Sequence, residues 1–167
     1  MFEKGDYIVY GNNGVCVVDE VTKMQVKGVS GDKKYYKLSP IANSMSKIFT
    51  PVDNDKVTMR KVMTKTEAEE LIASVPAAKP LEIENDKQRE EIYKQILKDC
   101  NPYDYFRAIK TLYSRKMERF AQGKKNTSVD ERYFKQIETN LYGEIAIALE
   151  CNPDEVTSMI QERIGEN

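Results

Sequence analysis

Basic side chains are concentrated in one stretch of this sequence, FRAIKTLYSRKMERFAQGKK at residues 106–125. Its seven basic residues are Arg107, Lys110, Arg115, Lys116, Arg119, Lys124 and Lys125, and Glu118 is its one acid. The whole chain carries 26 basic and 27 acidic residues, so the asymmetry is local. A basic stripe of this kind can follow a phosphate backbone without reading bases. The alternative is a solvated helix face that pairs with acidic residues of neighbouring helices.

The usual residues of an active site are missing from this sequence. It has no histidine, which is the commonest general base and the commonest metal ligand. It also has no glycine-rich phosphate loop, no GxSxG motif and no acidic calcium-binding loop. Cys16, Cys100 and Cys151 are far apart and lack metal-ligand spacing, which indicates reduced thiols buried as small apolar side chains. We therefore expect no enzyme activity, no metal, no cofactor and no small-molecule substrate.

The composition predicts a soluble, cytoplasmic protein. Charged residues make up 32% of the chain and hydrophobic residues 40%, which is typical of globular proteins. No stretch approaches the roughly 20 apolar residues that a membrane-spanning helix needs. The opening MFEKGD has no positively charged segment followed by an apolar run, so we expect neither a signal peptide nor a membrane partner.

The first part of the chain has the alternation and turn signals of short β-strands. The predicted strands are 6–10, 15–21, 33–40, 46–52 and 56–62. The first two are joined by a tight turn at GNNG, and Gly5 and Gly14 are placed to serve sharp bends. So few short strands cannot form a sandwich, and they favour a strongly bent barrel of SH3-like or Tudor-like size.

The residues from about position 64 onward show helical periodicity and helix-start signals. Thr66 with Glu69 three residues later predicts a capping box, and Asn101 before Pro102 predicts another helix start. The helix that follows is expected to pack against the core through one apolar face. This face consists of Phe106, Ile109, Leu112, Tyr113, Met117 and Phe120.

These patterns predict an α+β protein with two modules. Residues 1–62 form the small β-barrel, and residues 63–167 form an all-α helical bundle. Two modules joined by a proline-containing segment, without a catalytic constellation, suggest an adaptor in which each module binds a different partner.

The β module offers a surface of its own, because an exposed strand edge can accept a strand from a partner protein. Apolar residues near the predicted strand ends are Met24, Val26, Ile48 and Phe49. The alternative places most of them in the barrel core, since about half of the side chains of a strand face inward.

The opening FEKGDYIVYGNNGVCVVDEV, followed by YYKLSP and KIFTPVDN, is similar to the N-terminal module of CarD/CdnL-type bacterial transcription regulators. That module is shared with the transcription-repair coupling factor. Its most specific positions are occupied here by Gly5, Asp6, Val9, Tyr10, Gly14 and Val17. The helical half, with GEIAIAL at 143–149, resembles the helical part of the same family, so the resemblance spans nearly the whole chain.

The resemblance implies a regulator with two contacts. The Tudor-like module is expected to dock on the β subunit of RNA polymerase by strand-edge pairing. The candidate contacts are Met24, Val26, Ile48, Phe49 and Thr50. The helical domain is expected to touch promoter DNA at the upstream edge of the transcription bubble and to modulate initiation, for example at ribosomal RNA promoters. The candidate DNA contacts are Arg89, Arg115, Lys116, Lys124 and Lys125.

The sequence departs from the family at two places. The family inserts a tryptophan of the helical domain into the minor groove as a wedge. This chain has no tryptophan, and Asp86 falls at the wedge position. Met24 and Phe49 replace family basic residues in the polymerase-binding module, which makes that contact more apolar.

Two alternative functions therefore remain beside a regulator that binds both polymerase and DNA. One is a polymerase-binding interaction factor that does not bind DNA, which the missing tryptophan favours. The other is a hydrolase or transferase of unknown type. The linker around Pro76 and Pro80 and the exposed barrel edges allow either a monomer or a strand-swapped dimer.

Overall fold

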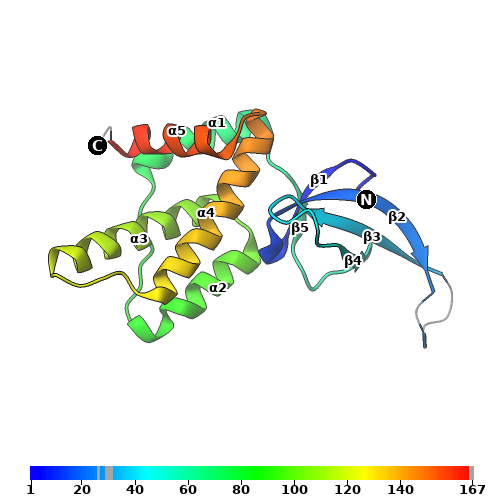
Figure 1. Ribbon diagram of the computed structural model, residues 1–167, viewed down its shortest axis with the longest axis horizontal. Helices are drawn as coiled ribbons and strands as arrows, with labels where there is room; N and C mark the ends of the chain where they lie inside the picture. Colours follow the sequence, from blue (N-terminus) through cyan, green and yellow to red (C-terminus); the bar gives the residue numbers. More distant parts are fainter. Residues whose placement is uncertain (26, 29–31, 166–167) are drawn as a thin grey trace.

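The computed structural model describes residues 1–25, 27–28 and 32–165, with a sheet on one side and helices on the other (Figure 1). The strands are β1 Tyr7–Tyr10, β2 Val15–Met24, β3 Lys33–Pro40, β4 Ile48–Pro51 and β5 Met59–Lys61. The α-helices are α1 Lys65–Ala73, α2 Arg89–Asp99, α3 Pro102–Ala121, α4 Ser128–Leu149 and α5 Pro153–Gly165. The short 3₁₀ turns are η1 Gly11–Asn13, η2 Val75–Ala77 and η3 Asp86–Gln88. The predicted α+β class is confirmed.

The five strands form one antiparallel sheet in the order β4-β3-β2-β1-β5. Among the described residues, β4 pairs only with β3, with Phe49 opposite Lys37, and β5 pairs only with β1, with Arg60 opposite Val9. Both are therefore edge strands whose outer backbone groups have no strand partner in the sheet. The pairing of β2 with β3 shifts register between Val18 and Glu20, where a bulge bends the hairpin.

The β1–β2 hairpin is apolar on both faces because both faces are covered. Successive side chains of a strand point to opposite sides. One side packs into the sheet core, which consists of Ile8, Tyr10, Cys16, Val18, Tyr36 and Leu38. On the other side, Val9 and Val15 pack against Cys100 at the end of α2, together with Val62 and Ile147. The hairpin is thus the layer between the two halves of the molecule.

The turn of this hairpin is fixed to α4. The amides of Gln136 and Asn140 both donate to the carbonyl of Asn12, at 3.0 and 3.2 Å. Gly14 has φ +67°, and a Cβ at this position would lie 2.8 Å from Oδ1 of Asn140. Glycine is required here by the backbone conformation and by the close approach of α4.

The helical core surrounds α3 and α4, and it buries only the first half of the stripe predicted for α3. Phe106, Ile109 and Leu112 are buried as expected. Tyr113, Met117 and Phe120 are not; their exposed fractions are 48%, 47% and 76%. The prediction that all six face the core is wrong, because the last turns of α3 extend past the elements that cover its first turns (Figure 1).

The helix starts were predicted with mixed success. Asn101 caps α3 as expected, with its side-chain oxygen accepting from the backbone amides of Tyr103 and Asp104. The capping box of α1 forms two residues earlier than predicted, between Thr64 and Glu67 rather than Thr66 and Glu69.

In the described residues, no helix is long and apolar enough to cross a membrane.

An ion pair joins the edge strand β5 to the helices. The guanidinium of Arg60 forms a bidentate pair with the carboxylate of Glu144 on α4, with one Nη2–Oε2 distance of 3.0 Å. Its Nε and Nη2 also donate to the carbonyl of Cys100, at 3.2 and 2.8 Å. The Glu144 side chain is 2% exposed. Burial alone would lower the pKa of Arg60, but the pair with Glu144 outweighs burial and raises it.

The first prediction concerns this pair. Arg60→Ala leaves the Glu144 carboxylate buried without its partner, so we expect the free energy of unfolding to fall by about 3 kcal/mol in urea titrations. Arg132→Ala is the matched control, because Arg132 is mostly exposed and pairs with Glu90 at the surface. It should cost less than about 1 kcal/mol. Equal losses for the two variants would show that the Arg60 pair does not hold the halves together.

Candidate functional site

Three of the five candidate polymerase-binding residues, Ile48, Phe49 and Thr50, lie on β4. Phe49 points outward and is 48% exposed, whereas Ile48 is half-buried and packs against the sheet core. Thr50 is 1% exposed and accepts a hydrogen bond from Asn54 at 2.9 Å, so its side chain is not available to a partner. Met24 is half-buried at the far end of the β2–β3 hairpin, and Val26 lies outside the described residues. Phe49 is therefore the exposed apolar residue on this edge.

Two of the predicted DNA-binding residues are held in internal ion pairs. Nε of Arg89 lies 3.1 Å from Oδ1 of Asp86, and Nη1 of Arg89 donates to the hydroxyl of Tyr93 at 3.2 Å. Nε of Arg115 lies 2.7 Å from Oδ2 of Asp130, and its Nη1 lies 3.6 Å from Oδ1 of Asp86. Asp86 thus bridges two arginines, so the charge of both is already compensated.

The position of Asp86 explains its residue type. It stands in η3 directly before α2, where its carboxylate connects α2 to α3 through the two arginines. Burial alone would lower the pKa of Arg89, but the contacts with Tyr93 and Asp86 raise it, so this arginine stays charged. A carboxylate in this role stabilises the helices and cannot act as an apolar wedge.

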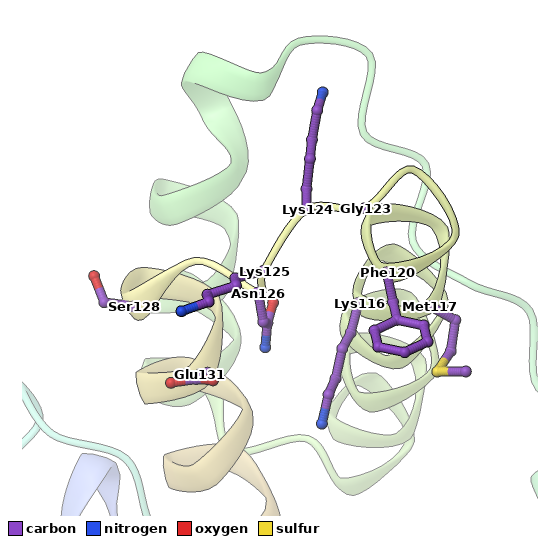
Figure 2. A pocket seen from close by; sticks show the side chains of 9 residues that line it. All are labelled: Lys116, Met117, Phe120, Gly123, Lys124, Lys125, Asn126, Ser128 and Glu131. Carbon is purple, nitrogen blue, oxygen red and sulfur yellow. The ribbon is translucent and has the colours of Figure 1, made fainter.

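The other three predicted DNA-binding residues form a different group. Lys116 on α3 and Lys124 and Lys125 in the following loop line one cleft together with Met117 and Phe120 (Figure 2). The cleft has a volume of about 870 Å³ and opens between the end of α3 and the start of α4. Across the part of the chain that the structure describes, none of the three lysine side chains forms an ion pair or hydrogen bond. We call this site the lysine cleft.

Local backbone chemistry shapes the loop of the lysine cleft. Gly123 has φ +74°, its amide donates to the carbonyl of Phe120, and the amide of Lys124 donates to the carbonyl of Arg119. These two bonds form a Schellman motif, which ends α3 and turns the chain back. Nε of Arg119 then donates to the carbonyl of Lys125 at 2.9 Å, which fixes the next residue of the loop.

The lysine cleft contains residues that sequence reasoning assigned to the core. Met117 and Phe120 continue the apolar period of α3, so periodicity alone places them inside. The available signal was their position in the last two turns, followed by a polar, lysine-containing loop. In Figure 2 their side chains lie next to each other on α3, and Glu131 approaches from α4.

The cysteines are poorly suited to nucleophilic chemistry. Burial raises the pKa of Cys16 to about 12, and it raises the pKa of Cys100 as well. Cys151 is half-buried, and its pKa is also raised by loss of solvation. Within the described ranges, no cluster of three or more acidic or cysteine side chains is placed to hold a metal ion.

Comparison with known proteins gives a family match for the N-terminal module. Residues 2–63 match the family model of the CarD-like/TRCF RID domain, which is an RNA polymerase-interacting domain. The resemblance stated for the opening strands is confirmed. The match ends at residue 63, so the resemblance of the helical half stays a prediction. No curated protein matches the chain.

The second prediction separates the two groups of basic residues by their effect on stability. Arg115→Ala leaves Asp130, whose side chain is 4% exposed, without its partner, and should lower the free energy of unfolding by about 3 kcal/mol. Lys116→Ala removes an unpaired surface charge from the next position and should change it by less than about 0.5 kcal/mol. Urea titrations of both variants measure the difference. A neutral Arg115→Ala would mean that this arginine is free to bind a partner.

Proposed function

Because residues 2–63 form a CarD-like/TRCF RID domain, we propose that this protein is a transcription regulator with two contacts. The β4 edge docks on the β subunit of bacterial RNA polymerase. The helical half contacts promoter DNA near the upstream edge of the transcription bubble and thereby modulates initiation. The family match is the observation that carries the proposal, and the lysine cleft supports its second half.

The edge geometry supports docking through β4. Its outer backbone groups have no strand partner in the sheet, so an extended segment of a partner could add to the sheet there. Phe49 adds an exposed aromatic side chain on the same strand, and aromatic residues are common anchors of protein interfaces. Backbone pairing would supply affinity, and Phe49 would supply the specific contact.

The charge distribution supports DNA contact through the lysine cleft rather than through η3 and α2. Arg89 and Arg115 would have to leave Asp86 and Asp130 before they could bind phosphate. Lys116, Lys124 and Lys125 have no ion-pair partner among the described residues. Neutralising phosphates with free lysines releases counterions, which is the main sequence-independent source of DNA affinity.

The two contacts belong to modules that we place at residues 1–62 and 63–167. Val62 packs with the apolar cluster between the halves, whereas Met63 packs in the helical core. The Arg60–Glu144 pair holds the modules in one relative position, so docking on polymerase would determine which stretch of DNA the lysine cleft can contact.

One observation favours the alternative of a polymerase-binding factor without DNA contact. The resemblance places Asp86 at the family wedge position, and its exposed carboxylate pairs with Arg89 and Arg115. Arg115 also pairs with the buried Asp130. This alternative keeps docking through β4 and removes any role in DNA binding from the lysine cleft.

The third prediction tests docking. Phe49→Asp puts a charge in the proposed interface and should reduce capture of the RNA polymerase β subunit at least tenfold in a pull-down. Val129→Asp is the control, because Val129 is an exposed apolar residue in the first turn of α4. Capture should survive that change. Undiminished capture by the Phe49 variant would exclude this edge as the docking surface.

The fourth prediction distinguishes the regulator from the alternative. Changing Lys116, Lys124 and Lys125 together to Gln should weaken duplex binding and reduce the slope of log K against log salt by about 2 to 3. Changing Lys34, Lys37 and Lys61 of the sheet together to Gln removes the same charge elsewhere and should leave the slope unchanged. A full slope in the first variant would place the DNA contact outside the lysine cleft. If the unaltered protein shows no salt-dependent duplex binding and still binds polymerase, the alternative without DNA contact is correct.

A further inference from the structure

Phe120 has an unusual environment for an aromatic side chain. It is 76% exposed, whereas the other large exposed aromatic residues, including Phe49 and Tyr113, are at most 48% exposed. It stands beside Met117, which is 47% exposed, and the two form an apolar surface on the last turns of α3 (Figure 2). Leaving this surface in water costs free energy that burial against a partner would recover.

The charges around Phe120 indicate the chemistry of that partner. Lys116, Lys124 and Lys125 line the same cleft, and Glu131 is the one acidic residue that does so. The excess of positive charge disfavours a basic segment and favours an anion. The partner should therefore combine negative charge with flat apolar surface.

A further polar group in the lining lacks a partner. Oδ1 of Asn126 is buried and accepts no hydrogen bond from any described residue. A buried acceptor without a donor is uncommon in folded proteins. Because this oxygen is shielded from solvent, an N–H group of a ligand would satisfy it only once the Asn126 side chain turns into the cleft.

These features fit one class of ligand better than the alternatives. Duplex DNA would meet the lysines with its phosphates but would leave Phe120 and Met117 unused, since its bases are stacked inside. An acidic peptide would satisfy the charges but offers few flat apolar groups. An unpaired nucleotide offers a phosphate, a base face that stacks on an aromatic ring, and N–H groups on the base edge.

We propose that the lysine cleft binds single-stranded DNA, with an unpaired base stacked on Phe120 and flanking phosphates held by Lys116, Lys124 and Lys125. The proposal rests on the DNA contact of the proposed function and specifies its form. The Schellman motif at Gly123 fixes the backbone that carries the two loop lysines next to the end of α3. The volume of about 870 Å³ is within the usual range for sites that bind small groups.

The absence of tryptophan from the chain allows a direct test. Phe120→Trp introduces a single tryptophan at the site. Its emission, excited selectively over that of the ten tyrosines, should be quenched on titration with an oligo-dT strand of about twenty nucleotides at low salt. Phe120→Ala should weaken binding of the same strand about tenfold, measured by fluorescence anisotropy of labelled DNA. Because Phe120 is exposed, both variants should fold, and far-ultraviolet circular dichroism checks this.

Phe49→Ala is the matched control, since it removes an exposed phenylalanine from the other surface. It should bind oligo-dT like the unaltered protein, while Phe120→Ala should still be captured by RNA polymerase. This crossed pattern separates the stacking proposal from polymerase docking, because either can fail while the other holds.

Three outcomes would overturn the proposal. The first is unchanged oligo-dT affinity in Phe120→Ala. The second is equal competition by a duplex or by polyglutamate of matched charge, which would show that the cleft responds to charge alone. The third is tighter binding of oligo-rU than of oligo-dT, which would assign the cleft to RNA.

Discussion

The relative position of the two halves depends on the guanidinium of Arg60. It enters from the edge strand β5 and meets both the buried carboxylate of Glu144 on α4 and the carbonyl of Cys100 after α2. The β1–β2 hairpin completes the junction, with Val9 and Val15 packed on Cys100 and the turn fixed to α4. A buried pair of this kind adds modest net stability but is costly to break, so it specifies one geometry.

This junction fixes the two exposed surfaces relative to each other. The sheet carries β4 with Phe49 in one half of the molecule, and the end of α3 with the lysine cleft lies at the far end of the helical half (Figure 1). A flexible connection would let each surface bind independently. Under the proposed function, a fixed connection would let docking on polymerase determine which stretch of DNA the lysines can reach. Under the same proposal, the ion pairs of Arg89 and Arg115 leave the lysines at the end of α3 as the DNA contact.

Local patterns in the sequence were enough to predict the strands and most helices, whereas the family of the N-terminal module was suggested by resemblance to a known family and matched over residues 2–63. Apolar alternation and turn residues depend on only a few neighbouring positions, so they predict secondary structure without knowledge of the fold. The candidate site was harder to predict, because the charge of a residue and the hydrophobic periodicity of its helix do not show which residues of other elements it contacts. Arg115 and Lys116 are neighbours in sequence, yet one faces Asp130 and the other faces solvent. Phe120 follows the period of buried Phe106 but lies beyond the elements that cover it.

The central claim is that one rigid chain bridges polymerase and promoter DNA through opposite surfaces. Site-specific photo-cross-linking in the assembled polymerase–promoter complex tests it most directly, with a benzophenone amino acid placed at position 49 or at position 120. We expect position 49 to cross-link to the β subunit and position 120 to cross-link to DNA at the upstream edge of the bubble. Cross-linking of both positions to protein alone, or of neither to its expected target, would contradict the account.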